Sequence, residues 1–148
     1  MGDVIDEFVY RASVTVSGGR VGHAASDDGL LDVEFARPGS HAGTNPEQML
    51  AAGWGACFLS TIHAVGRKAA IDTENARVVV EVTLGKTVEK FFALEAEIHA
   101  SLPGVAAEDA MELVEEAHKR CPYSRALSPN IKVRISVGES ASELRLDI

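Results

Sequence analysis

Residues 44–58 read Thr-Asn-Pro-Glu-Gln-Met-Leu-Ala-Ala-Gly-Trp-Gly-Ala-Cys-Phe, and this stretch decides the fold. Asn45 is of a type preferred at a helix N-cap and Pro46 of a type preferred at the first helical position, so a helix is predicted to begin here. Apolar side chains recur every three or four residues as far as Val65, and the run ends at Gly66. Because this helix is apolar on most of its surface, it is expected at the centre of the molecule.

The segments on either side of this helix alternate between polar and apolar residues in the manner of β-strands. Strands are predicted at residues 7–16, 20–24, 31–35, 77–84, 91–100 and 131–137, and an amphipathic helix at 106–120. This order of elements, with turns between most neighbouring strands, predicts an α+β fold with an antiparallel sheet, in a single domain over 1–148. Residues 139–148 are predicted to form a loose tail, and Leu144 and Ile148 are the side chains by which it could dock against the rest of the chain.

The central helix also indicates an assembly. A helix that is apolar all round is difficult to cover within one chain of 148 residues. A second copy of the chain would cover it, and two-fold homo-oligomers are the commonest protein assemblies. An obligate homodimer is therefore predicted.

The composition limits the kinds of partner. The chain has 22 acidic and 14 basic side chains, a formal net charge of -8, which disfavours nucleic acid as a ligand. No run approaches the roughly 20 consecutive apolar residues that cross a bilayer, so no membrane association is predicted. The acidic residues 1–7 lack the basic and apolar regions of a signal peptide, so a cytoplasmic location is expected.

Cys57 and Cys121 are the only thiols in the sequence. In a reducing cytosol such a pair is more often catalytic, redox-active or metal-binding than a permanent disulfide. The alternative is that each is a small buried hydrophobe, which is the commonest state of a free cysteine. The separation of 64 residues does not show whether the two touch, so both interpretations stay open.

The histidines do not indicate a metal site. No metal-ligand spacing links them to one another or to the cysteines, so a structural metal is not predicted. His41, just before the central helix, is the histidine expected closest to the site. The full set is His23, His41, His63, His99 and His118.

Arg20 and Glu47 are the charged residues considered as partners of Cys57. Arg20 lies in a tight turn, where most arginines are solvated, but beside Cys57 it would stabilise a thiolate and bind a peroxide oxygen. Its guanidinium would need a carboxylate to orient it, and Glu47 is the candidate. Glu47 lies ten residues before Cys57, about 15 Å along a helix, so a break near Gly53 would be needed to bring the two together. Alternatively, Glu47 is a first-turn acid that favours the helix dipole.

At these residues the chain resembles the organic hydroperoxide resistance (Ohr) family, a branch of the larger osmotically inducible protein C (OsmC) group. The resemblance runs from about Tyr10 to Val137, nearly the whole chain. Its specific element is the combination of Thr-Asn-Pro-Glu-Gln with a downstream Ala-Cys-Phe and a distant Cys-Pro-Tyr-Ser. The matching blocks cover residues 17–22, 26–33, 43–48, 51–58, 117–118 and 121–124.

The resemblance implies a role for each residue singled out above. Cys57 would be the peroxidatic thiol, Cys121 the resolving thiol, and Arg20 with Glu47 the pair that activates Cys57 and orients the peroxide. It also implies an intertwined OsmC-like homodimer whose antiparallel sheets wrap around two central helices.

The implied reaction reduces alkyl or fatty-acid hydroperoxides to alcohols, through a sulfenic acid on Cys57 and a Cys57–Cys121 disulfide. The resemblance names dihydrolipoamide or a lipoylated protein as the dithiol reductant, and it requires no metal, flavin or haem. Met49, Trp54 and Phe58, together with residues of a partner subunit, are expected to line the substrate site and to favour bulky organic peroxides over hydrogen peroxide.

Two other functions were considered. A stress peroxidase of the broader OsmC type would reduce hydrogen peroxide and lipid hydroperoxides with less preference. A non-catalytic protein that binds apolar ligands would keep both thiols free after exposure to peroxide.

Overall fold

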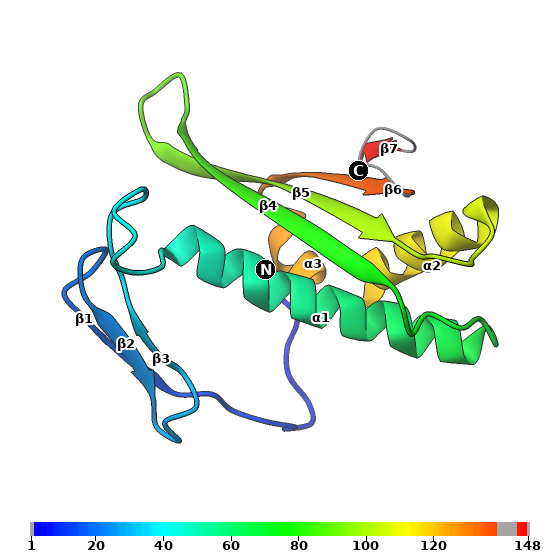
Figure 1. Cartoon of the computed structure of the whole chain (residues 1–148), viewed down its shortest axis with the longest axis horizontal. Helices are drawn as coiled ribbons and strands as arrows, with labels where there is room; N and C mark the ends of the chain where they lie inside the picture. Colours follow the sequence, from blue (N-terminus) through cyan, green and yellow to red (C-terminus); the bar gives the residue numbers. More distant parts are fainter. Residues whose placement is uncertain (1, 139–144, 148) are drawn as a thin grey trace. The chain divides into compact units, whose positions relative to one another are not determined.

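The computed structural model describes residues 2–138 and 145–147 (Figure 1). The chain forms two compact units, Met1–Met49 and Leu50–Ile148. Both strands and helices are present, so the predicted α+β class is confirmed. The single domain over 1–148 stays a prediction.

The first unit contains a three-stranded antiparallel sheet in the order β1-β2-β3, as the predicted meander requires. Its strands are β1 (Val14–Ser17), β2 (His23–Ser26) and β3 (Asp32–Glu34). Residues 7–13 alternate in sequence but lie outside any strand, because no described strand pairs with them. The turn from β1 to β2 depends on glycine: Gly18 and Gly19 have φ of 74° and 61°, and a Cβ on Gly22 would lie 1.9 Å from the Ser17 carbonyl oxygen.

Helix α1 (Pro46–Lys68) begins where the sequence predicts. The Asn45 side-chain oxygen accepts a 2.9 Å hydrogen bond from the Gln48 backbone N–H, which is the expected N-cap. The predicted break near Gly53 is wrong, since α1 is continuous through Gly53 and Gly55 (Figure 1).

The two helical glycines instead permit close packing. A Cβ on Gly53 would lie 2.8 Å from the Tyr123 hydroxyl, and a Cβ on Gly55 would lie 3.4 Å from Val80 Cγ2. The absence of a side chain at Gly53 leaves room for the phenol of Tyr123. The absence of a side chain at Gly55 lets strand β4 (Arg77–Lys86) pack closely against α1.

The second unit contains a four-stranded sheet in the order β4-β5-β6-β7. Its strands are β4 (Arg77–Lys86), β5 (Phe92–Ser101), β6 (Lys132–Val137) and β7 (Arg145–Asp147). The predicted β4–β5 hairpin is confirmed. Part of the predicted tail, β7, pairs with β6, whereas the predicted docking of Leu144 and Ile148 falls outside the described residues.

The sheet of the second unit is not wholly antiparallel, which corrects the prediction. Strands β5 and β6 are parallel, with Ile98 opposite Ile135. Parallel neighbours need a long crossover, and helices α2 (Ala107–Arg120) and α3 (Pro122–Leu127) supply it. The alternation of side chains does not encode strand direction, so the sequence pattern could not reveal this pair.

One face of α1 closes the core against β5, β6 and α2. The fully buried side chains of this core include Trp54, Phe58, Ile62, Ile98, Val114 and Ile135. The rest of α1 is accessible: by length and composition it even qualifies as a membrane-spanning candidate, and only 28% of its most apolar window is buried. Core helices of globular proteins meet the same criterion, and α1 contributes three of the largest buried side chains to this core.

Candidate active site

The two cysteines occupy different local structures. Cys57 lies within α1 and is half-buried, whereas Cys121 lies between α2 and α3 and is fully buried. Cys121 has φ -60° and ψ 123°, the extended conformation that a following proline favours. Pro122 thus ends α2, begins α3 and turns the chain at Cys121.

The fold brings the two thiols into contact. The Cys57 and Cys121 side chains are hydrogen-bonded to each other, and neither cysteine is in a disulfide. Burial raises the pKa of Cys57, and the Cys121 thiol raises it further, while a hydrogen bond from the Tyr123 backbone N–H to the Cys57 sulfur lowers it. Sequence separation left this contact open, and the structure places the two thiols side by side.

A buried hydrogen bond fastens α3 to α1 beside the thiols. Trp54 Nε1 donates to Ser124 Oγ over 3.0 Å, and both side chains are fully buried. Ser124 follows Cys121 by three residues, and Trp54 precedes Cys57 by three. The bond therefore joins the two segments that carry the cysteines.

The burial of Trp54 and Phe58 changes their expected role. Both side chains have 0% exposure. The structure gives them a packing role around the thiols, in place of the expected direct contact with substrate. Met49, in the first turn of α1, is half-buried and keeps some accessible surface.

His118 lies in the matching block 117–118 and is buried, with 7% of its surface exposed. Its ring packs against Phe58 with centroids 6.4 Å apart, and its Nδ1 has no hydrogen-bond partner among the described residues. Burial lowers the pKa of His118, so the imidazole is neutral at neutral pH.

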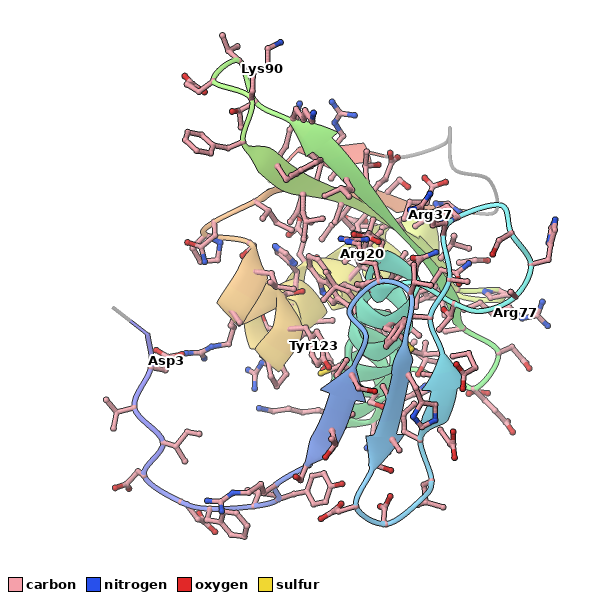
Figure 2. All side chains as sticks on the ribbon, turned by 90° about the vertical axis from the view of Figure 1, so that its left-hand side faces the viewer. Asp3, Arg20, Arg37, Arg77, Lys90 and Tyr123 are labelled. Atoms are coloured by element: carbon pink, nitrogen blue, oxygen red, sulfur yellow. The ribbon has the colours of Figure 1, made fainter. Side chains whose placement is uncertain are left out.

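Arg20 and Glu47 form a bidentate ion pair within the first unit, as predicted for the orientation of the guanidinium. Arg20 Nη1 donates to Glu47 Oε2 over 3.0 Å, and Nη2 donates to Oε1 over 2.6 Å. The hydrogen bond from Arg20 holds the pKa of Glu47 below its usual range. Glu47 is well shielded, with 15% of its side chain exposed, but Arg20 at the β1–β2 turn is 53% exposed (Figure 2). The pair thus presents an oriented cation with accessible surface.

No interaction with Cys57 is recorded for His41, the histidine that the sequence places closest to the site, in the part of the chain that the structure describes. His41 is exposed in the loop before α1, with a φ of 59°. No group of three or more possible metal ligands occurs among residues 2–138 and 145–147.

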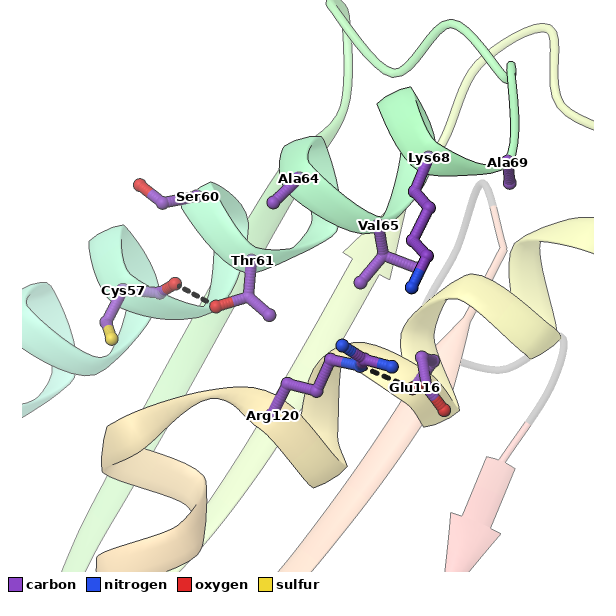
Figure 3. A pocket seen from close by; sticks show the side chains of 9 residues that line it. All are labelled: Cys57, Ser60, Thr61, Ala64, Val65, Lys68, Ala69, Glu116 and Arg120. Atoms are coloured by element: carbon purple, nitrogen blue, oxygen red, sulfur yellow. Dashed lines mark hydrogen bonds and ion pairs between the residues drawn. The ribbon is translucent and has the colours of Figure 1, made fainter.

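A groove of about 840 Å³ begins at Cys57 and follows α1 (Figure 3). Small and apolar side chains of α1 line its middle, Lys68 lies toward its far end, and Arg120 and Glu116 of α2 line the opposite side (Figure 3). Arg120 forms an ion pair with Glu116. The lining consists of Cys57, Ser60, Thr61, Ala64, Val65, Lys68, Ala69, Glu116 and Arg120.

Sequence reasoning missed this groove. Lys68 follows the glycine at which the predicted apolar run ends, and Arg120 is the last residue of the predicted amphipathic helix. The sequence does show that both cations lie in the last turns of their helices. Cations are common there because they interact favourably with the helix dipole, so their position alone does not indicate a groove.

Comparison with known proteins gives consistent matches. The family model for OsmC-like protein matches residues 39–136. The organic hydroperoxide resistance protein OhrA of Bacillus subtilis is 37% identical over 142 residues, covering 88% of this chain and 97% of that protein.

Two solved structures extend the match to the fold. The crystal structure of OhrB of Bacillus subtilis superposes with a TM-score of 0.81 at 36% identity, covering 86% of this chain and 98% of that chain. An organic hydroperoxide resistance protein from Legionella pneumophila gives 0.82 at 40% identity, covering 89% and 99%.

Proposed function

The chain belongs to the organic hydroperoxide resistance family within the OsmC/Ohr superfamily, and from this we propose that it is a cysteine-based peroxidase that reduces organic hydroperoxides to alcohols. A role in peroxide detoxification follows from the family. The observation that carries the thiol mechanism is the hydrogen-bonded contact between half-buried Cys57 and buried Cys121. The experiment that tests it is the paired replacement of these cysteines.

In the proposed first half-reaction, the Cys57 thiolate attacks the terminal oxygen of the hydroperoxide. The O–O bond breaks, and the alkoxide takes a proton and leaves as the alcohol. The sulfur is oxidised to a sulfenic acid.

In the proposed second half-reaction, the Cys121 sulfur attacks the sulfenic sulfur of Cys57. Water leaves and a disulfide forms between the two residues. An external dithiol then reduces this disulfide by exchange. Cys121 is fully buried, so the reductant reaches the pair through Cys57, which suits a slender dithiol such as dihydrolipoamide or the arm of a lipoylated protein. Each step balances with no metal, flavin or haem, and a reducing cytoplasm would suit this cycle.

A cation is needed to activate Cys57. Burial and the Cys121 thiol both raise the pKa of Cys57, and a hydrogen bond from the Tyr123 backbone N–H opposes them. We propose Arg20, oriented by Glu47, as that cation, on the strength of the family resemblance and of the bidentate pair.

Arg20→Ala is expected to move the pH dependence of Cys57 alkylation to higher pH. The sign follows because a nearby cation stabilises the thiolate and lowers the thiol pKa, so its removal raises that pKa. The measurement is the rate of reaction with iodoacetamide against pH, in the Cys121→Ser background so that one thiol reports. Arg37→Ala, which removes another exposed arginine of the same unit, is the control. An unchanged profile in Arg20→Ala would remove Arg20 from the mechanism.

We also propose that the protein is a homodimer. Large apolar side chains are exposed in both units: Phe8, Tyr10, Phe91 and Phe92 are each at least 70% exposed. A single folded chain rarely leaves so many aromatic side chains in water. Light scattering is expected to give twice the chain mass of 15.7 kDa at micromolar concentration, and a mass of 15.7 kDa would contradict the dimer.

A further inference from the structure

One face of α1 meets the segment that carries Cys121. Gly53 and Trp54 precede Cys57 by four and three residues, and positions with this spacing are neighbours on a helix surface. Residues 121–124 lie against these three positions. The Cys121 thiol is hydrogen-bonded to the Cys57 thiol, which is the first contact between the two segments.

Two further contacts join the segments beside the thiols. Trp54 Nε1 donates to Ser124 Oγ over 3.0 Å, and both residues are fully buried. The Tyr123 phenol occupies the space that a side chain at position 53 would need, since a Cβ on Gly53 would lie 2.8 Å from its hydroxyl oxygen. Tyr123 is thus anchored to α1 by packing, and Ser124 is anchored by a buried hydrogen bond.

These anchors fix the direction of a backbone donor. The Tyr123 N–H donates a hydrogen bond to the Cys57 sulfur. Tyr123 is the second residue of α3, and the N–H groups in the first turn of a helix have no carbonyl of that helix to accept them. The Cys57 sulfur is the acceptor that the packing of α3 against α1 gives to this N–H.

The Tyr123 N–H acts most strongly when Cys57 is ionised. Once the thiol has lost its proton to water, the sulfur is an anionic acceptor, and hydrogen bonds to ionised acceptors are stronger than neutral ones. Burial raises the pKa of Cys57, and this bond opposes that effect because it stabilises the thiolate more than the thiol. A displacement of α3 would bend the bond, and hydrogen bonds weaken steeply as they depart from linearity.

We propose that Trp54 and Ser124 are positioning residues of the peroxidase, whose buried hydrogen bond holds the Tyr123 N–H on the Cys57 sulfur while that sulfur is a thiolate. This inference rests on the proposed peroxidase function and adds two residues to it. Both side chains are fully buried, so they act on the thiolate through the backbone of α3 and not through contact with a substrate.

The test is a double-mutant cycle measured on the thiol, as the rate of reaction with iodoacetamide against pH. Trp54→Phe removes the donor and Ser124→Ala the acceptor, each in a Cys121→Ala background that leaves Cys57 as the only thiol and keeps Arg20. Each variant is expected to move the profile to higher pH and to lower the rate at neutral pH about threefold, as for the loss of one hydrogen bond. The double variant is expected to show the same fall as either single variant. Independent effects would multiply to about tenfold and would overturn the proposal.

Ser136→Ala, in the same background, is the matched control. Ser136 is buried in β6 and its Oγ is hydrogen-bonded to His99 Nδ1 over 2.8 Å, so this variant also removes a buried serine hydroxyl and its hydrogen bond. It is expected to lower the thermal midpoint, as Ser124→Ala does, and to leave the alkylation profile of Cys57 unchanged. An equal change of profile in the two serine variants would show a general effect of lost stability and would overturn the proposal.

A backbone substitution tests the donor without changing any side chain. The hydroxy-acid analogue of tyrosine at position 123 replaces the N–H by an ester oxygen and keeps the phenol. It is expected to lower the alkylation rate at neutral pH at least as much as Ser124→Ala does, and an unchanged profile would overturn the proposal. Alkylation requires no peroxidase activity, so either result is separate from failure of the proposed function, which would appear as no consumption of cumene hydroperoxide by the parent protein.

Discussion

Cys57→Ser is expected to lower peroxidase turnover at least about a thousandfold, to the rate without enzyme. A serine hydroxyl stays protonated at neutral pH and is a poor nucleophile toward peroxide oxygen, so neither the attack nor a sulfenic acid is available. The measurement is consumption of cumene hydroperoxide with dihydrolipoamide as reductant. Cys57 is half-buried, and serine has nearly the same volume, so the fold is expected to survive.

The controls separate loss of chemistry from loss of fold. Far-UV circular dichroism and the thermal midpoint report folding of Cys57→Ser. Ser60→Ala, one turn along α1 at an exposed position of the groove, is expected to keep turnover close to that of the parent. Turnover that persists in a folded Cys57→Ser protein would rule out Cys57 as the nucleophile.

Cys121→Ser is expected to consume one hydroperoxide per chain in a rapid burst and then to stop. The first half-reaction needs only Cys57, but the sulfenic acid then has no neighbouring thiol to condense with. Excess hydroperoxide is expected to oxidise it further to the sulfinic acid. Mass spectrometry of the intact chain measures this as the addition of one oxygen atom, followed by a second.

A buried hydroxyl at position 121 is a possible source of misfolding, so Cys121→Ala is the companion variant. Both variants are expected to give the same burst. Steady turnover in either one, with dihydrolipoamide present, would show that Cys121 is not needed for resolution. Steady turnover of the parent with glutathione but not with dihydrolipoamide would remove the proposed reductant.

The elements that the sequence predicts best are those with local signals. Asn45 and Pro46 define the start of α1, and the alternation of residues 77–84 and 91–100 predicts the β4–β5 hairpin. Arg20 and Glu47 were paired from chemistry alone, because a guanidinium that is to stay oriented needs a carboxylate.

Features that depend on distant packing were missed. Gly53 was interpreted as a helix break, because the approach of Tyr123 from a segment 70 residues away leaves no local signal. Trp54 and Phe58 were placed at the substrate, since an apolar side chain near a thiol gives the same sequence pattern in the core and at a pocket wall. The groove from Cys57 to Lys68 was also missed, because a lysine in the last turn of a helix is expected from the helix dipole alone.

Cys121 lies in the crossover that joins the parallel strands β5 and β6. Under the proposed cycle, a chain in which this crossover has not packed against α1 has no second thiol held beside Cys57. A local opening of the crossover that withdraws Cys121 would leave a sulfenic acid on Cys57 exposed to a second peroxide, so the free energy of that opening would limit the number of cycles that each molecule survives.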